Sequence, residues 1–183
     1  MSSDTFSMPR LTLISPFVTA AALCIGSGCT PTFNWREVRP DDTRLSLLLP
    51  CKPDKAQKPV SLGGQSTTLS MLGCDAGGVT FAVAVVDLSK GMTASSVLSQ
   101  WKSVTLTNMK AGAEQVEAVK LPGAALEPSP VLVKAQGRRA DGAAVTGQML
   151  YFVQGTQVFQ AVMYASQITP DTADTFFSSL KFD

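Results

Sequence analysis

The chain has 183 residues, and its 15 Lys and Arg against 14 Asp and Glu leave a formal net charge of +1. Such a balanced composition offers no basic surface for a phosphate backbone, so we expect no nucleic-acid partner. There is no histidine, which excludes Ser-His-Asp and Cys-His catalysis and the common histidine-containing zinc sites. We therefore expect no metal and no cofactor.

The N-terminal segment has the layout of an export signal. Residues 11–25 carry no charge, follow Arg10, and end at the small residues 26–28 before Cys29. About 15 apolar residues are typical of a signal-peptide core and are short for a membrane span, which needs roughly 20. Small residues directly before a cysteine resemble the lipobox of bacterial lipoproteins, in which that cysteine becomes lipidated.

The resemblance implies that residues 1–28 are a signal peptide and that Cys29 carries acyl chains such as palmitate. The protein would then be anchored in the bacterial cell envelope, facing the periplasm. Thr30 follows, where lipoproteins kept at the inner membrane have aspartate, so the outer membrane is favoured. Gly26 stands where the lipobox has a large aliphatic residue. Two alternatives to lipidation of Cys29 therefore remain open: secretory cleavage around residues 19–21, and an uncleaved N-terminal anchor. Each of the three outcomes would export the domain.

Residues 29–43 are predicted to form an extended polar tether before a single domain at residues 44–183. Pro31 and Pro40 favour an extended chain. Trp35 is the one large apolar anchor in this stretch, and we expect it to dock on the domain.

Cys51 and Cys74 are the only cysteines after Cys29. In an oxidising compartment we expect them to form a disulfide. In the chain-entropy model the loop they close is worth about 3 kcal/mol. Two free structural thiols are the alternative, and no histidine is present to complete a metal site.

Apolar alternation and turn dipeptides predict eight strands, at 45–49, 58–62, 66–74, 79–86, 115–121, 131–139, 144–153 and 157–165. In the clearest of them, 79–86, one face carries bulky side chains and the other small ones such as Ala82 and Ala84. A face of small residues lets a helix or a second layer approach closely.

Two helices are predicted from the spacing of apolar residues. The first runs from Thr93, a plausible N-cap, to Gly112. Trp101 is expected to pack it on the sheet, and stacking on a ligand is the alternative role for this residue. The second is capped by Thr169 and begins with Pro170. This element order predicts an α+β fold, in which a long helix and a C-terminal helix pack on one antiparallel sheet.

Three features resemble the PsbP-like α/β sandwich found in small bacterial lipoproteins. An opening strand ends in proline at 45–50, a late hairpin joins 148–152 to 158–161, and the chain closes on the apolar sequence 176–182. The resemblance implies an accessory, binding or assembly role more often than catalysis.

Catalytic motifs are sparse. The sequence has no Gly-x-Ser-x-Gly elbow, P-loop or dinucleotide fingerprint. Ser-Lys catalysis needs no histidine, and its nearest pairs are Ser89 with Lys90 and Ser179 with Lys181. Both pairs fall at the ends of predicted elements, so we assign no catalytic residues.

Arg138 and Arg139 precede a predicted turn at 141–142. They could hold an anionic group, although a solvated hairpin tip is favoured. We therefore expect a non-enzymatic accessory or binding protein of the envelope, attached to a membrane through its lipid and with a possible protein partner. A Ser-Lys hydrolase is the alternative.

Overall fold

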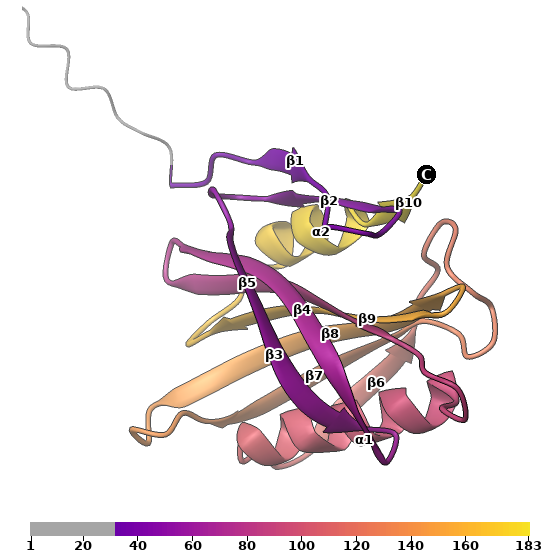
Figure 1. Ribbon diagram of the computed structural model, residues 1–183. Helices are drawn as coiled ribbons and strands as arrows, with labels where there is room; N and C mark the ends of the chain where they lie inside the picture. The colour runs from indigo at the N-terminus through magenta and orange to yellow at the C-terminus, as the bar shows by residue number, and fades with distance from the viewer. Residues whose placement is uncertain (1–31) are drawn as a thin grey trace, which may run out of the picture. The chain divides into compact units, whose positions relative to one another are not determined.

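The computed structural model describes residues 32–183 (Figure 1). In chain order the elements are β1 (Arg36–Val38), β2 (Leu45–Leu49), β3 (Asp54–Leu62), β4 (Gln65–Ala76), β5 (Val79–Asp87), α1 (Ala94–Asn108), β6 (Glu114–Ala118), β7 (Val131–Arg138), β8 (Ala144–Gln154), β9 (Gln157–Ala165), α2 (Pro170–Ser178) and β10 (Lys181–Phe182). The predicted signal peptide and Cys29 lie outside these residues.

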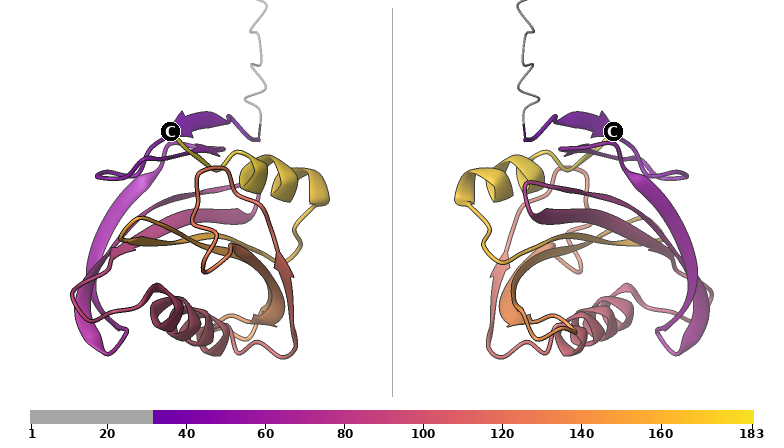
Figure 2. Two further views of the ribbon diagram at one scale, coloured as in Figure 1. Left: turned by 90° about the vertical axis from the view of Figure 1, so that its right-hand side faces the viewer. Right: turned by 90° about the vertical axis from the view of Figure 1, so that its left-hand side faces the viewer.

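The strands form two antiparallel sheets. The large sheet has seven strands in the order β3-β4-β5-β9-β8-β7-β6, and the small sheet has the order β1-β2-β10. Within the large sheet β5 pairs with β9, so α1 and three strands lie between these neighbours in the chain. The large sheet curves around α1, whereas α2 and the small sheet lie on its other side (Figure 2).

The structure corrects the predicted fold class. Strands hold 48% of the described residues and helices 16%, and there are two sheets rather than one. β1 and β10 are three and two residues long, too short to show alternation, and only their pairing with β2 makes them strands. Helix α1 ends at Asn108, before the predicted Gly112. The predicted α+β class, a PsbP-like sandwich of two helices on one sheet, is therefore wrong, because the chain is mainly β and its strands form two sheets.

The large sheet separates two hydrophobic clusters, and we name its faces after the helix on each side. On the α2 face, Phe81 and Val83 of β5 pack with Leu45 and Phe176. On the α1 face, Ala82, Ala84 and Val86 of the same strand share a cluster with Val97, Leu98 and Trp101 of α1. The bulky and small faces predicted for this strand thus serve two separate layers.

Aromatic side chains fill the α2 face. The Phe81 ring lies edge-on to Trp35, Phe33 and Phe176, with centroids 5.7, 6.2 and 5.4 Å apart. Such edge-to-face pairs each add about 0.5–1.5 kcal/mol beyond burial. Trp35 therefore docks on the domain, as the sequence predicts.

The predicted disulfide is present. Cys51, just after β2, is bonded to Cys74 of β4, with the two Cα atoms 6.0 Å apart. The bond joins the small sheet to the large one, so it holds the two layers of the α2 face together.

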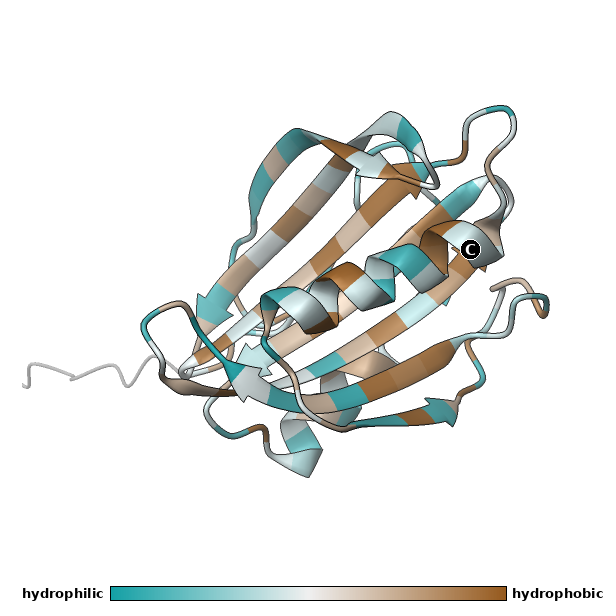
Figure 3. Cartoon of the chain, turned by 90° about the horizontal axis from the view of Figure 1, so that it is seen from below, coloured by the Kyte–Doolittle hydropathy of each residue, from teal (hydrophilic) through white to brown (hydrophobic). Residues whose placement is uncertain are grey.

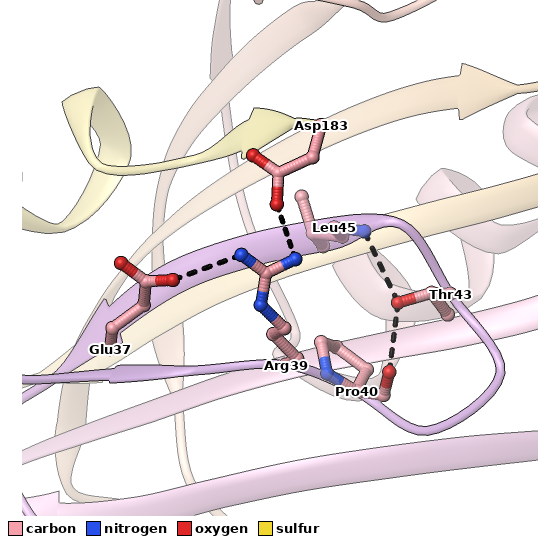
Figure 4. A network of polar contacts seen from close by, with 6 residues as sticks. All are labelled: Glu37, Arg39, Pro40, Thr43, Leu45 and Asp183. Carbon is pink, nitrogen blue, oxygen red and sulfur yellow. Dashed lines mark hydrogen bonds and ion pairs between the residues drawn. The ribbon is translucent and has the colours of Figure 1, made fainter.

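The segment before β2 is bound to the domain as well (Figure 4). The N–H of Asn34 donates to the carbonyl of Pro50 at 2.8 Å, and β1 pairs with β2. Arg39 pairs with Asp183 near the C-terminus and with Glu37 at 3.1 Å. Within the segment 29–43, the residues from Phe33 onward thus lie against the domain.

Candidate functional site

A groove of about 500 Å³ opens between α1 and the α1 face of the large sheet. This volume lies within the usual range for small-molecule sites, roughly 300–1,000 Å³. We call it the α1 groove, and its main apolar walls are Leu69, Met71, Ala82, Ala84, Trp101 and Val162. Figure 3 shows α1 lying across the sheet, with hydrophobic strand segments visible on both sides of the helix.

The course of α1 creates the groove. Near its middle, the Gln100 side chain accepts a 2.6 Å hydrogen bond from the N–H of Gly63, at the β3–β4 turn. At its end, the Met109 carbonyl accepts a 2.7 Å bond from the N–H of Arg138. A Cβ at Gly137 would lie 2.1 Å from that carbonyl, so only glycine permits this approach. The helix thus crosses the sheet obliquely and leaves part of β4 and β5 uncovered.

Small side chains keep the uncovered part hollow. Ala82 and Ala84 of β5 line the groove, and each presents only a methyl group to it. Larger residues at these two positions would extend into the space between the strand and α1.

A hydrogen-bonded group forms part of the groove floor. The Gln160 amide donates to the Thr105 hydroxyl at 3.0 Å and to the Tyr151 hydroxyl at 2.8 Å. All three residues are buried, and they link α1 to β8 and β9. Because each buried polar group has a partner here, the network stabilises the helix position.

Tyr164 lines the groove from β9. Burial raises the pKa of its hydroxyl, and the neighbouring Tyr151 raises it further. The hydroxyl therefore stays protonated near neutral pH and can donate a hydrogen bond within the groove.

Three exposed cations, Lys58, Arg138 and Arg139, border the groove. Arg138 is partly fixed because its guanidinium donates to the Gly142 carbonyl at 3.1 Å. Within residues 32–183, no carboxylate lines the groove and none of the three cations has an ion pair. The groove is thus an apolar hollow with a positive edge.

A second groove of about 440 Å³ lies under α2, beside β6, β7 and β8. We call it the α2 groove. Its charges are of both signs, with Glu117 and Asp174 beside Lys120 and Lys134. Lys134 already pairs with Glu117 at 3.4 Å. Its charges therefore offset one another, unlike those of the α1 groove.

The two serines considered for Ser-Lys catalysis have different surroundings, and neither is hydrogen-bonded to a lysine. The Ser179 hydroxyl donates to the Phe176 carbonyl at 2.6 Å and accepts from the Leu48 N–H at 2.9 Å, so it closes α2 and anchors β2. Ser89 is exposed in the turn after β5. Among the hydrogen bonds of the described residues, neither serine has a lysine partner.

Sequence reasoning missed the α1 groove. Arg138 and Arg139 are exposed at the β7–β8 hairpin, as the sequence predicts, but both also line the groove beside the end of α1. The small face of β5 was the available signal, since it predicted close approach by another layer. The groove also depends on the direction of α1, which periodicity does not reveal.

Two further structural findings concern residues 32–183. Their Cys, Asp and Glu side chains form no cluster of three or more suited to a metal ion. Neither of their helices has the length and apolar character needed to cross a membrane.

Comparison with known proteins adds little. No family model matches the chain, and no curated protein is significantly similar to it in sequence. A crystal structure of protein PA94 from Pseudomonas aeruginosa, described as a candidate regulator of unknown function, matches at 14% identity with a TM-score of 0.34. The match covers 76% of this chain and 85% of that chain. At this level of similarity it carries no inference.

Proposed function

We propose that the protein is a non-enzymatic ligand-binding domain of the bacterial cell envelope, held at a membrane by a lipid on Cys29. The observation that carries the binding role is the α1 groove. It combines ligand-sized volume, apolar walls and a few polar groups at its floor and edge, the usual composition of a small-molecule site. Of the two serines that could support a hydrolase, Ser179 holds α2 and β2 in place and Ser89 is exposed in a turn, and no hydrogen bond of the described residues joins either to a lysine.

Export is supported by the disulfide and by the N-terminal layout. A disulfide between Cys51 and Cys74 persists in oxidising compartments outside the cytoplasm. Small residues before Cys29 favour lipidation, and Thr30 favours the outer membrane.

The short segment between Cys29 and the residues that contact the domain limits how far the domain can extend from the membrane. Asn34 is already hydrogen-bonded to the domain, five positions after Cys29. Five extended residues span at most about 17 Å. A lipid on Cys29 would therefore hold the domain close to the membrane.

Cell fractionation tests the anchor. The full chain is expressed in a bacterial host, and its distribution between membrane and soluble fractions is compared for Cys29→Ser and for the matched variant Cys24→Ser. We expect Cys29→Ser to move the protein into the soluble fraction and Cys24→Ser to leave it with the membrane. Continued membrane association of Cys29→Ser would contradict the lipid anchor.

Binding of a neutral fluorescent probe tests the groove. The exported Cys29→Ser protein, purified without detergent, is titrated with N-phenyl-1-naphthylamine, whose emission rises in apolar surroundings. We expect Ala84→Phe, which fills the α1 groove, to abolish the rise. Val119→Phe adds bulk to the α2 groove and serves as the control. The binding role would be contradicted if the probe emission does not rise with the protein that has no groove substitution. It would also be contradicted if Ala84→Phe leaves the rise in emission unchanged.

A further inference from the structure

We propose that the ligand of the α1 groove is a fatty acid, with its carboxylate at Arg138 and Arg139 and its chain between α1 and β4–β5. This inference rests on the proposed binding role and adds the chemical class of the ligand.

The charge distribution selects an anionic group. Lys58, Arg138 and Arg139 border the groove, and no carboxylate of the described residues lines it. Arginine side chains form paired hydrogen bonds with a carboxylate. In the α2 groove, by contrast, Lys134 already pairs with Glu117. Of the two grooves, only the α1 groove is lined by cations with no carboxylate of the described residues beside them.

The apolar walls favour a ligand with a long acyl chain over a small anion. Leu69 and Met71 of β4, with Ala82 and Ala84 of β5, lie on the same side of the groove, and Trp101 of α1 also lines it. Methionine side chains adapt to flexible apolar ligands. A free phosphate or acetate ion is too small to cover this apolar surface.

The volume of the groove favours a ligand with one acyl chain over a ligand with two. About 500 Å³ is in the lower half of the range for small-molecule sites. A single acyl chain with a compact head group suits this space better than a diacyl phospholipid.

Polar groups of the groove complement a carboxylate. Tyr164 also lines this groove, and its hydroxyl can donate a hydrogen bond. Gln160 and Thr105 already bond to each other, so they form a fixed floor rather than a competing anion site.

Quenching of Trp101 tests the inference. The exported Cys29→Ser protein, purified without detergent, is titrated with palmitate brominated in mid-chain and with a neutral monoacylglycerol that carries the same chain. Bromine quenches tryptophan only at close range, and Trp101 lines the groove whereas Trp35 lies on the α2 face. In the control Trp101→Phe, we expect the quenching to disappear while Trp35 still emits.

Charge variants identify the head-group site. Arg138→Gln with Arg139→Gln is compared with Arg36→Gln and Arg44→Gln, which remove the same charge from exposed positions outside the groove. We expect the first pair to weaken palmitate binding about tenfold, because two exposed arginine–carboxylate contacts are lost. Neither pair should alter binding of the monoacylglycerol.

Three results would overturn the inference. Equal affinity for the two lipids would remove the anionic head group while leaving the binding role intact. If the arginine variants weaken the binding of both lipids equally, the anionic head group is likewise excluded while the binding role stands. Absence of Trp101 quenching together with normal binding of N-phenyl-1-naphthylamine would exclude fatty acids, whereas loss of both signals would contradict the binding role itself.

Discussion

The two faces of the large sheet have opposite packing, although they share the same strands. On the α2 face, Phe81 is fully buried among aromatic rings and the disulfide closes the layer. On the α1 face, Ala82 and Ala84 leave a hollow beside an obliquely placed helix. The difference predicts that large side chains of the α2 face contribute more to stability than the side chains that line the groove of the α1 face, where we propose that a ligand binds.

Removing a large ring from the α2 face should have the largest effect on stability. We expect Phe81→Ala to lower the free energy of unfolding by about 3–5 kcal/mol, because it leaves a cavity among packed aromatic side chains. Urea unfolding followed by circular dichroism measures the change. The matched variant on the other face is Met71→Ala, at a partly exposed groove wall, for which we expect a loss of under about 1 kcal/mol. Similar losses for both variants would contradict the contrast between the faces.

Loss of the disulfide should have the second-largest effect on stability. Replacing Cys51 and Cys74 with serine should reduce the free energy of unfolding by about 3 kcal/mol, since the unfolded chain is no longer constrained by the closed loop. The same unfolding experiment measures it. Binding of N-phenyl-1-naphthylamine should be unchanged at temperatures where the variant is folded, because the bond lies on the α2 face. Loss of binding in the folded variant would show that the two faces are not independent.

The polar floor of the α1 groove should contribute less. We expect Tyr151→Phe to cost about 1 kcal/mol of unfolding free energy, the usual value of a buried hydrogen bond. The Gln160 amide loses one acceptor in this variant and keeps Thr105. An unchanged unfolding midpoint would mean that the bond does not help to hold α1 over the sheet.

The smallest effect on stability is expected where the groove is filled. Ala82→Leu adds apolar volume to a hollow, so the free energy of unfolding should change by no more than about 1 kcal/mol. Binding of brominated palmitate should nevertheless weaken strongly, as measured by Trp101 quenching. A large loss of stability would show that position 82 is tightly packed rather than open.

Local patterns predicted most elements and the disulfide, because alternation, turn glycines and caps are short-range signals. The two faces of β5 were also visible in the order of its valines and alanines. The two-sheet arrangement was not, since β10 becomes a strand only through pairing Lys181 with Ser46 across the whole chain. The groove escaped prediction for a related reason. Its shape depends on the Gly137 contact that directs the end of α1, and no periodicity reports such a contact.

A crystal structure grown with brominated palmitate tests the central claim most directly, because bromine can be located by its anomalous scattering. We predict bromine between α1 and strands β4 and β5, with the carboxylate beside Arg138 and Arg139. Bromine in the α2 groove, or a carboxylate bound away from both arginines, would contradict the assignment of the α1 groove as the ligand site.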